Sequence, residues 1–62
     1  MKVSIDYYSL PGSLSGRVIV KDVYTYEKLE DITVDLLNTT VKDTVEKMKA
    51  KYPNYELREF KY

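Results

Sequence analysis

The chain has 62 residues, no cysteine and no histidine, and its 10 basic and 10 acidic side chains give a net charge of zero. This composition excludes a disulfide framework, a thiolate nucleophile, and any Ser-His-Asp or Cys-His catalytic group. The carboxylates match no calcium-loop or iron-triad spacing, so we expect no metal. We therefore expect a protein that is not an enzyme and binds no cofactor.

The length predicts one domain, residues 1–62. At 7.3 kDa, area scaling gives a folded surface of about 4,200 Å² and a buried area of about 6,400 Å². The hydrophobic gain from that burial and the entropic cost of ordering the chain are each about 95 kcal/mol. Because the two nearly cancel, the core is barely sufficient, and a partner could supply the missing stability.

No apolar run approaches the ~20 residues that a membrane helix needs, and the residues after Met1 lack the order of a signal peptide. The expected location is therefore cytoplasmic.

The first half of the chain predicts two strands joined by a long loop. Residues 2–8 alternate, with Val3, Ile5 and Tyr7 on one side. A second segment, rich in β-branched and aromatic residues, begins at Arg17 and could extend to Tyr26.

The loop between these strands contains the turn dipeptide Pro11-Gly12. It also contains Leu10 and Leu14. A leucine in a loop either folds beneath the hairpin or contacts a partner, and the sequence leaves both open.

The second half begins with a charged segment, 27–31, that predicts a turn, followed by alternating residues 32–37 that predict a third short strand. Thr40 is a suitable helix N-cap, with Asp43 three residues later. One helical face then carries Val41, Val45, Met48 and Tyr52. Pro53 ends the helix, and residues 55–62 predict a last strand.

This order predicts an α+β fold: a three- to four-stranded sheet with one helix packed on one face. The strand at 31–36 and the helix at 43–51 resemble the second strand and helix of the ubiquitin-like β-grasp family. The resemblance covers about a third of the chain and implies a scaffold that acts as a binding module. Conjugating members of that family end in Gly-Gly, whereas this sequence ends Phe60-Lys61-Tyr62, so conjugation is not implied.

One helix covers only one face of a sheet, so the strand alternation predicts a second, uncovered face. Seven tyrosines and one phenylalanine are many for this length. Tyrosine and arginine are enriched at interface hot spots. The residues expected there are Tyr8, Arg17, Ile19, Lys21, Val23, Arg58, Phe60 and Tyr62. A β-bulge that reverses the alternation would instead return some of these rings to the core.

We interpret this face as a surface that binds protein. The chain would regulate or inhibit a larger partner, as small proteins of phages, viruses and plasmids do, and would self-associate as a homodimer. The alternative is a single-stranded nucleic-acid-binding protein, in which the rings stack on bases and Arg17, Lys21 and Arg58 meet phosphates. The acidic segment 22–35 argues against that alternative.

Overall fold

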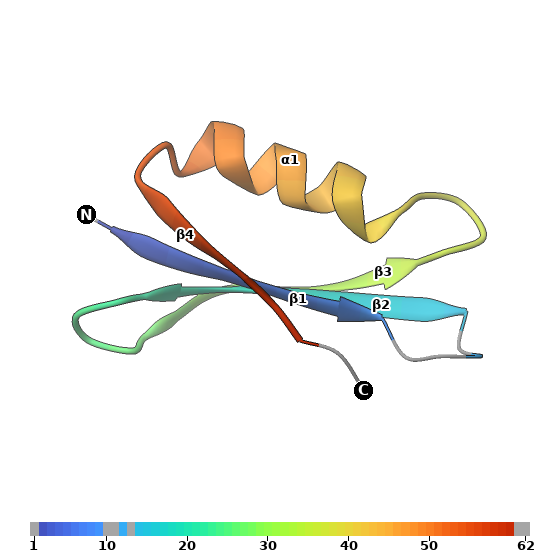
Figure 1. Ribbon diagram of the computed structural model, residues 1–62, viewed down its shortest axis with the longest axis horizontal. Coiled ribbons are helices and arrows are strands. Elements are labelled where there is room, and N and C mark those ends of the chain that lie inside the picture. The colour runs from blue at the N-terminus through green and yellow to red at the C-terminus, as the bar shows by residue number, and fades with distance from the viewer. Residues whose placement is uncertain (1, 10–11, 13, 61–62) are drawn as a thin grey trace.

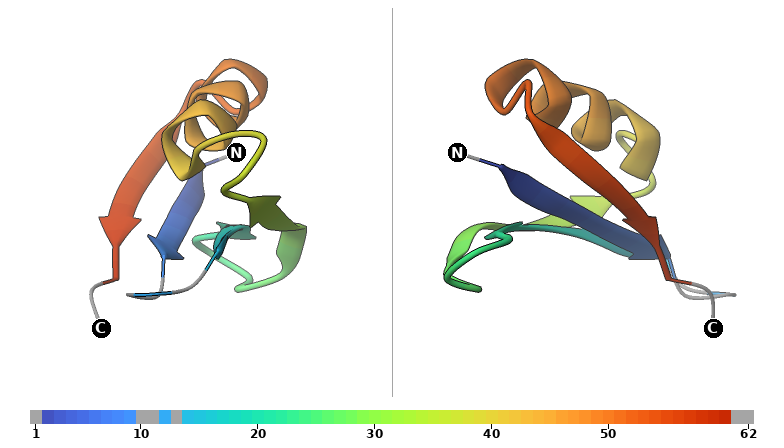
Figure 2. Two further views of the ribbon diagram at one scale, coloured as in Figure 1. Left: turned by 90° about the vertical axis from the view of Figure 1, so that its right-hand side faces the viewer. Right: turned by 60° about the vertical axis from the view of Figure 1, so that its left-hand side comes forward.

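The computed structural model in Figure 1 describes residues 2–9, 12 and 14–60. Its elements are β1 (Val3–Ser9), β2 (Ser15–Asp22), β3 (Lys28–Asp35), α1 (Val41–Lys51) and β4 (Tyr55–Glu59). The strands form one mixed sheet in the order β3-β2-β1-β4, and α1 lies across one face of it (Figure 2). The predicted α+β class, element order and single covered face are confirmed.

The sheet is mixed because one of the three pairings between its described strands is parallel. β1 pairs antiparallel with β2 and parallel with β4, and β2 pairs antiparallel with β3. The chain therefore leaves β3 at one edge, crosses the sheet through α1, and enters β4 at the other edge. Both β3 and β4 are edge strands as a result.

The core lies between α1 and the two central strands. Val3, Ile5, Val18 and Val20 are fully buried on the side of the sheet that faces the helix. The helix contributes Val45, Met48 and Thr44 to this layer, and Val34 of β3 completes it. The predicted apolar face of the helix is thus confirmed, with Val41 and Tyr52 packed at its two ends.

Helix α1 begins where the sequence predicts. The hydroxyl of Thr40 accepts a hydrogen bond from the backbone N–H of Asp43, 3.1 Å away, so one otherwise unpaired donor of the first turn is satisfied. At the other end the N–H of Tyr52 donates to the carbonyl of Met48, and Pro53 follows.

Several strand boundaries differ from the prediction, among them the end of β2 and both ends of β3, which stops at Asp35 and not at Leu37. β2 ends at Asp22 because the next residues form a tight turn: the Asp22 carboxylate accepts from the N–H groups of Tyr24 and Thr25. The charged segment 27–31 is not a turn, since β3 begins at Lys28. Its charged side chains are compatible with a strand because an edge strand leaves much of its surface in water.

The folded chain has an accessible surface of 4307 Å², close to the area expected from its mass. The last strand is shorter than predicted, since β4 ends at Glu59. Leu10 and Tyr62, singled out from the sequence, lie outside the described residues, whereas Leu14 is described and its side chain is exposed.

Candidate protein-contact face

The side of the sheet opposite α1 is called the open face here. Residues that pair directly across neighbouring strands point to the same side of a sheet. Tyr8 pairs with Arg17, and Asp6 lies between Ile19 and Arg58. Alternation along each strand then defines the open face. Its strand residues are Ser4, Asp6, Tyr8, Ser15, Arg17, Ile19, Lys21, Lys28, Asp31, Thr33, Asp35, Glu56 and Arg58, and Val23 and Phe60 lie just beyond the strands.

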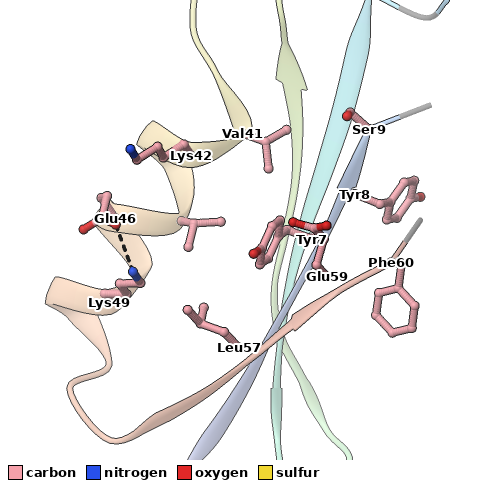
Figure 3. A pocket seen from close by; sticks show the side chains of 11 residues that line it. Tyr7, Tyr8, Ser9, Val41, Lys42, Glu46, Lys49, Leu57, Glu59 and Phe60 are labelled. Atoms are coloured by element: carbon pink, nitrogen blue, oxygen red, sulfur yellow. Dashed lines mark hydrogen bonds and ion pairs between the residues drawn. The ribbon is translucent and has the colours of Figure 1, made fainter. Parts of the chain in front are cut away.

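The structure places seven of the eight predicted residues on this face. These seven are Tyr8, Arg17, Ile19, Lys21, Val23, Arg58 and Phe60. The eighth, Tyr62, is outside the described residues. Figure 3 shows Tyr8 and Phe60 pointing together, away from the helix. The single register irregularity between β2 and β3 falls at Val20/Lys21, so it does not move Tyr8 or Ile19 to the core side.

The open face is less aromatic and more ionic than expected. Arg58 and Phe60 are exposed, whereas the other five described members are half-buried. Carboxylates that the sequence prediction left out lie among them: Asp31 accepts from Arg17 Nε at 2.7 Å and from Lys28 Nζ at 3.0 Å.

These ion pairs change the charge properties of the residues involved. The hydrogen bonds from Arg17 and then Lys28 hold the pKa of Asp31 well below its usual range. The bond to Asp31 raises the pKa of Arg17 in turn. Arg17 and Asp31 are 14 residues apart, so no local spacing in the sequence indicates this pair, and only the strand register reveals it.

A buried polar pair lies at the centre of the open face. Ser4 and Asp6 are only 5% and 9% exposed, and the Ser4 hydroxyl donates to Asp6 Oδ1 at 2.6 Å. A shallow depression of about 120 Å³ next to them is bounded by Lys21, Arg58 and Tyr26. The face is therefore slightly hollowed, with an acid at its floor and two cations at its rim.

Two exposed tyrosines lie in a turn and not in a strand, and one of them, Tyr26, extends this face. Tyr24 and Tyr26 are 75% and 80% exposed in the turn between β2 and β3, although the sequence placed them in a strand. Tyr26 borders the same depression as Asp6 and Arg58. The signal that could have located the turn is Asp22, whose side chain caps it.

A second hollow lies on the helix side of the sheet, between α1 and β4 (Figure 3). This groove has a volume of about 630 Å³. Its apolar lining comes from Tyr7, Val41, Val45 and Leu57, and Leu57 is 43% exposed. Tyr8 and Phe60 of the open face also border this groove, at the ends of β1 and β4. On the helix rim, Lys49 contacts Glu46 at 2.9 Å, and the pKa of Lys49 is raised by that bond.

The described residues offer no metal centre, because no three acidic side chains among them lie close enough to share an ion. In the same part of the chain, no helix has the length and apolar character required to cross a membrane. Comparisons with protein-family models, with curated proteins and with solved structures gave no match.

Proposed function

We propose that this chain is a non-enzymatic, cytoplasmic protein-binding module that regulates or inhibits a larger protein through its open face, and that it self-associates. The observation that supports the proposal is that the strand register gathers Tyr8, Arg17, Ile19, Arg58 and Phe60 on the one sheet face that the helix leaves uncovered. Aromatic and arginine side chains on an uncovered face are typical of binding hot spots.

The charge pattern of this face favours a protein over a nucleic acid. Arg17 and Lys28 contact Asp31, and Lys2 and Arg58 contact Glu56. A phosphate backbone would have to compete with both carboxylates for these cations. A protein surface can instead oppose both signs of charge, which gives orientation and selectivity.

The proposal is tested with two matched variants of the full chain. Phe60→Asp places a charge on the open face, and Leu37→Asp makes the same kind of change at a 72% exposed leucine in the loop between β3 and α1. Each protein is used for affinity capture from cells that produce it, with quantitative mass spectrometry. A partner identified there is then purified and titrated by calorimetry.

We expect the partner to bind the wild type and Leu37→Asp with similar affinity. We expect it to bind Phe60→Asp at least about tenfold more weakly. Equal binding by Phe60→Asp would show that the open face is not the contact surface.

The nucleic-acid alternative gives a different result. In fluorescence anisotropy, labelled single-stranded oligonucleotides would bind with an affinity that falls steeply with salt and that Phe60→Asp reduces. That outcome would replace the proposed function, because stacking on Tyr8 and Phe60 would then explain the face.

A further inference from the structure

Strand β4 presents an open backbone edge. The Val3 N–H donates to the Asn54 carbonyl, and the Phe60 N–H donates to the Tyr7 carbonyl. In a parallel ladder this pattern turns the backbone N–H and C=O groups of the even-numbered residues of β4 toward β1. The N–H and C=O groups of Tyr55 and Leu57 therefore point outward, at the edge of the sheet where the described chain provides no further strand.

We infer that the partner of this edge is a second copy of the chain, joined by antiparallel pairing of β4 with β4 about a twofold axis at Leu57. The inference rests on the self-association proposed above and assigns it to one strand. An outward-facing residue on the axis forms two backbone hydrogen bonds with its own copy, so Leu57 pairs with Leu57. The two four-stranded sheets become one continuous sheet.

The charges of β4 select this register. With Leu57 on the axis, Glu56 lies directly opposite Arg58 of the second copy, and Arg58 lies opposite Glu56 of the second copy. These are positions of close side-chain approach across an antiparallel junction. An axis at Glu56 or at Arg58 would instead place like charges opposite each other.

Both side chains are available for this contact. Their exposed fractions are 46% for Glu56 and 57% for Arg58, and within one chain they lie 3.9 Å apart. Glu56 also contacts Lys2 at 3.1 Å. The junction would therefore continue an alternating row of charges that the open face already carries.

The other edge of the sheet offers this self-complementarity only at its beginning. An axis at Leu29 would place Lys28 opposite Glu30, but only residues 28–30 of β3 would then pair, and both side chains already form ion pairs within the chain, with Asp31 and Lys51. If β3 pairs with itself about Thr33, Asp31 faces Asp35. If the axis lies at Asp31 or Ile32, Glu30 faces Ile32 or Val34. Charges of β3 then meet either like charges or aliphatic side chains, which does not favour pairing.

The helix side of the sheet supports the same geometry. Leu57 is on the groove side, 43% exposed, and on the axis it packs against its own copy. A twofold axis perpendicular to the sheet keeps both helices on one side. The grooves of the two copies then meet at the junction, with the paired leucines in its floor.

Because β4 has only five residues, the new junction is short. The area that it buries is below the range of stable permanent dimers, so the association is weak and concentration-dependent. Its dependence on two charge pairs also makes it weaker at high salt.

The experiment uses complementary charge reversals in the full chain, measured by sedimentation equilibrium over a wide concentration range. Glu56→Arg alone places cations opposite cations at the junction, and Arg58→Glu alone places carboxylates opposite carboxylates. An equimolar mixture of the two variants restores opposite charges at both positions. Thermal unfolding of each variant checks that it folds.

We expect a dimer for the wild type, a dissociation constant at least about tenfold higher for each variant alone, and recovery of the dimer in the mixture. Recovery requires that both variants be folded, so it separates a charge effect from misfolding. A wild type that stays monomeric overturns both the self-association and its assignment to β4.

If both single variants dimerise as the wild type does, self-association stands but β4 is not the junction. If the wild type is monomeric while an extended peptide shifts the amide signals of Tyr55 and Leu57 in NMR spectra, the occupant is a foreign strand, and the second-copy assignment is wrong.

Discussion

Gly16 lies where β2 passes against the first turn of the helix. A Cβ at this position would overlap the Cγ2 of Val41 and lie 3.0 Å from the carbonyl oxygen of Tyr8. Neither atom can move freely, because Val41 is β-branched within a helix and Tyr8 belongs to a central strand. Only glycine fits this approach of helix to sheet.

Replacement of Gly16 by alanine should therefore destabilise the fold. The added methyl group must push α1 away from β2, at a cost of about 1–3 kcal/mol for overpacking. Urea unfolding followed by circular dichroism measures the change. The matched control is Ser15→Ala, at an exposed neighbour in the same strand. Equal effects of the two substitutions would contradict the assigned contact.

Tyr26 occupies a strained backbone conformation. Its φ angle is +62°, in the left-handed region, and its N–H donates to the carbonyl of Asp22 to close the turn. For residues other than glycine and asparagine, that conformation costs roughly 1–2 kcal/mol. The position is thus unfavourable for the fold but presents a ring beside the open face.

Tyr26→Asn is expected to raise the free energy of unfolding by about 0.5–1 kcal/mol, because asparagine tolerates the left-handed region. The gain would be seen as a higher Tm. Tyr24→Asn, in the same turn, should give no such increase, since the positive φ belongs to Tyr26. A lower Tm for Tyr26→Asn would show that the ring itself stabilises the turn.

At the scale of elements, α1 and β3 illustrate opposite cases. The helix was predicted correctly from end to end because its signals are local: the cap at Thr40, one apolar face, and Pro53 just after the end. The start of β3 was predicted wrongly, as a turn, because its charged residues find their partners far away in sequence. Glu30, for example, accepts hydrogen bonds from Lys51 and Tyr52 at the end of the helix.

The ion pair between Arg17 of β2 and Asp31 of β3 predicts how the stability of the fold changes with pH. The pKa of Asp31 is lowered in the folded chain, first by the hydrogen bonds from Arg17 and then by those from Lys28. A lowered pKa contributes stability that is present above the ordinary value of about 3.9 and is lost as the pH falls toward the folded value. The pKa of Glu30 is lowered as well, chiefly by Lys51.

We therefore expect the wild type to lose stability below about pH 4, and Asp31→Asn to lose less over the same interval. Urea midpoints measured from neutral to acidic pH compare the two proteins. The control is Asp43→Asn. The backbone N–H of Asp43, and not its carboxylate, forms the hydrogen bond with the Thr40 hydroxyl at the helix N-cap. Parallel pH profiles for the wild type and Asp31→Asn would rule out this linkage.

At the scale of the whole molecule, one helix on one thin sheet leaves little margin of stability. For 62 residues the free energy of unfolding is expected to be about 3–9 kcal/mol. Ile5 lies at the centre of the core, fully buried and paired with Val20 on one side and Leu57 on the other.

Ile5→Ala should cost about 2–5 kcal/mol, which is comparable to the whole stability of the chain. Ile5→Val, which removes one methylene, should cost only about 0.5–1.5 kcal/mol and remain folded. Calorimetry distinguishes the two. A cooperative transition of Ile5→Ala near the wild-type Tm would mean that the core has more reserve than its size implies.

The candidate site was predicted only in part. Alternation assigned Tyr8, Ile19 and Phe60 to the uncovered face correctly, because side-chain direction in a strand has a fixed period of two. Asp6 and Asp31, which make the face ionic, were missed, since their neighbours are set by pairing between strands. The open edge of β4 could not be inferred without the strand order.

The sequence alone determined the element order, the helix with its cap, and the side of each strand that is buried, because these depend on residues within a few positions of one another. The tertiary structure alone decided which strands lie at the edges, which charges meet across the open face, and that Tyr26 belongs to a turn. The physical reason is range: backbone and side-chain periodicity act locally, whereas strand pairing joins residues separated by half the chain.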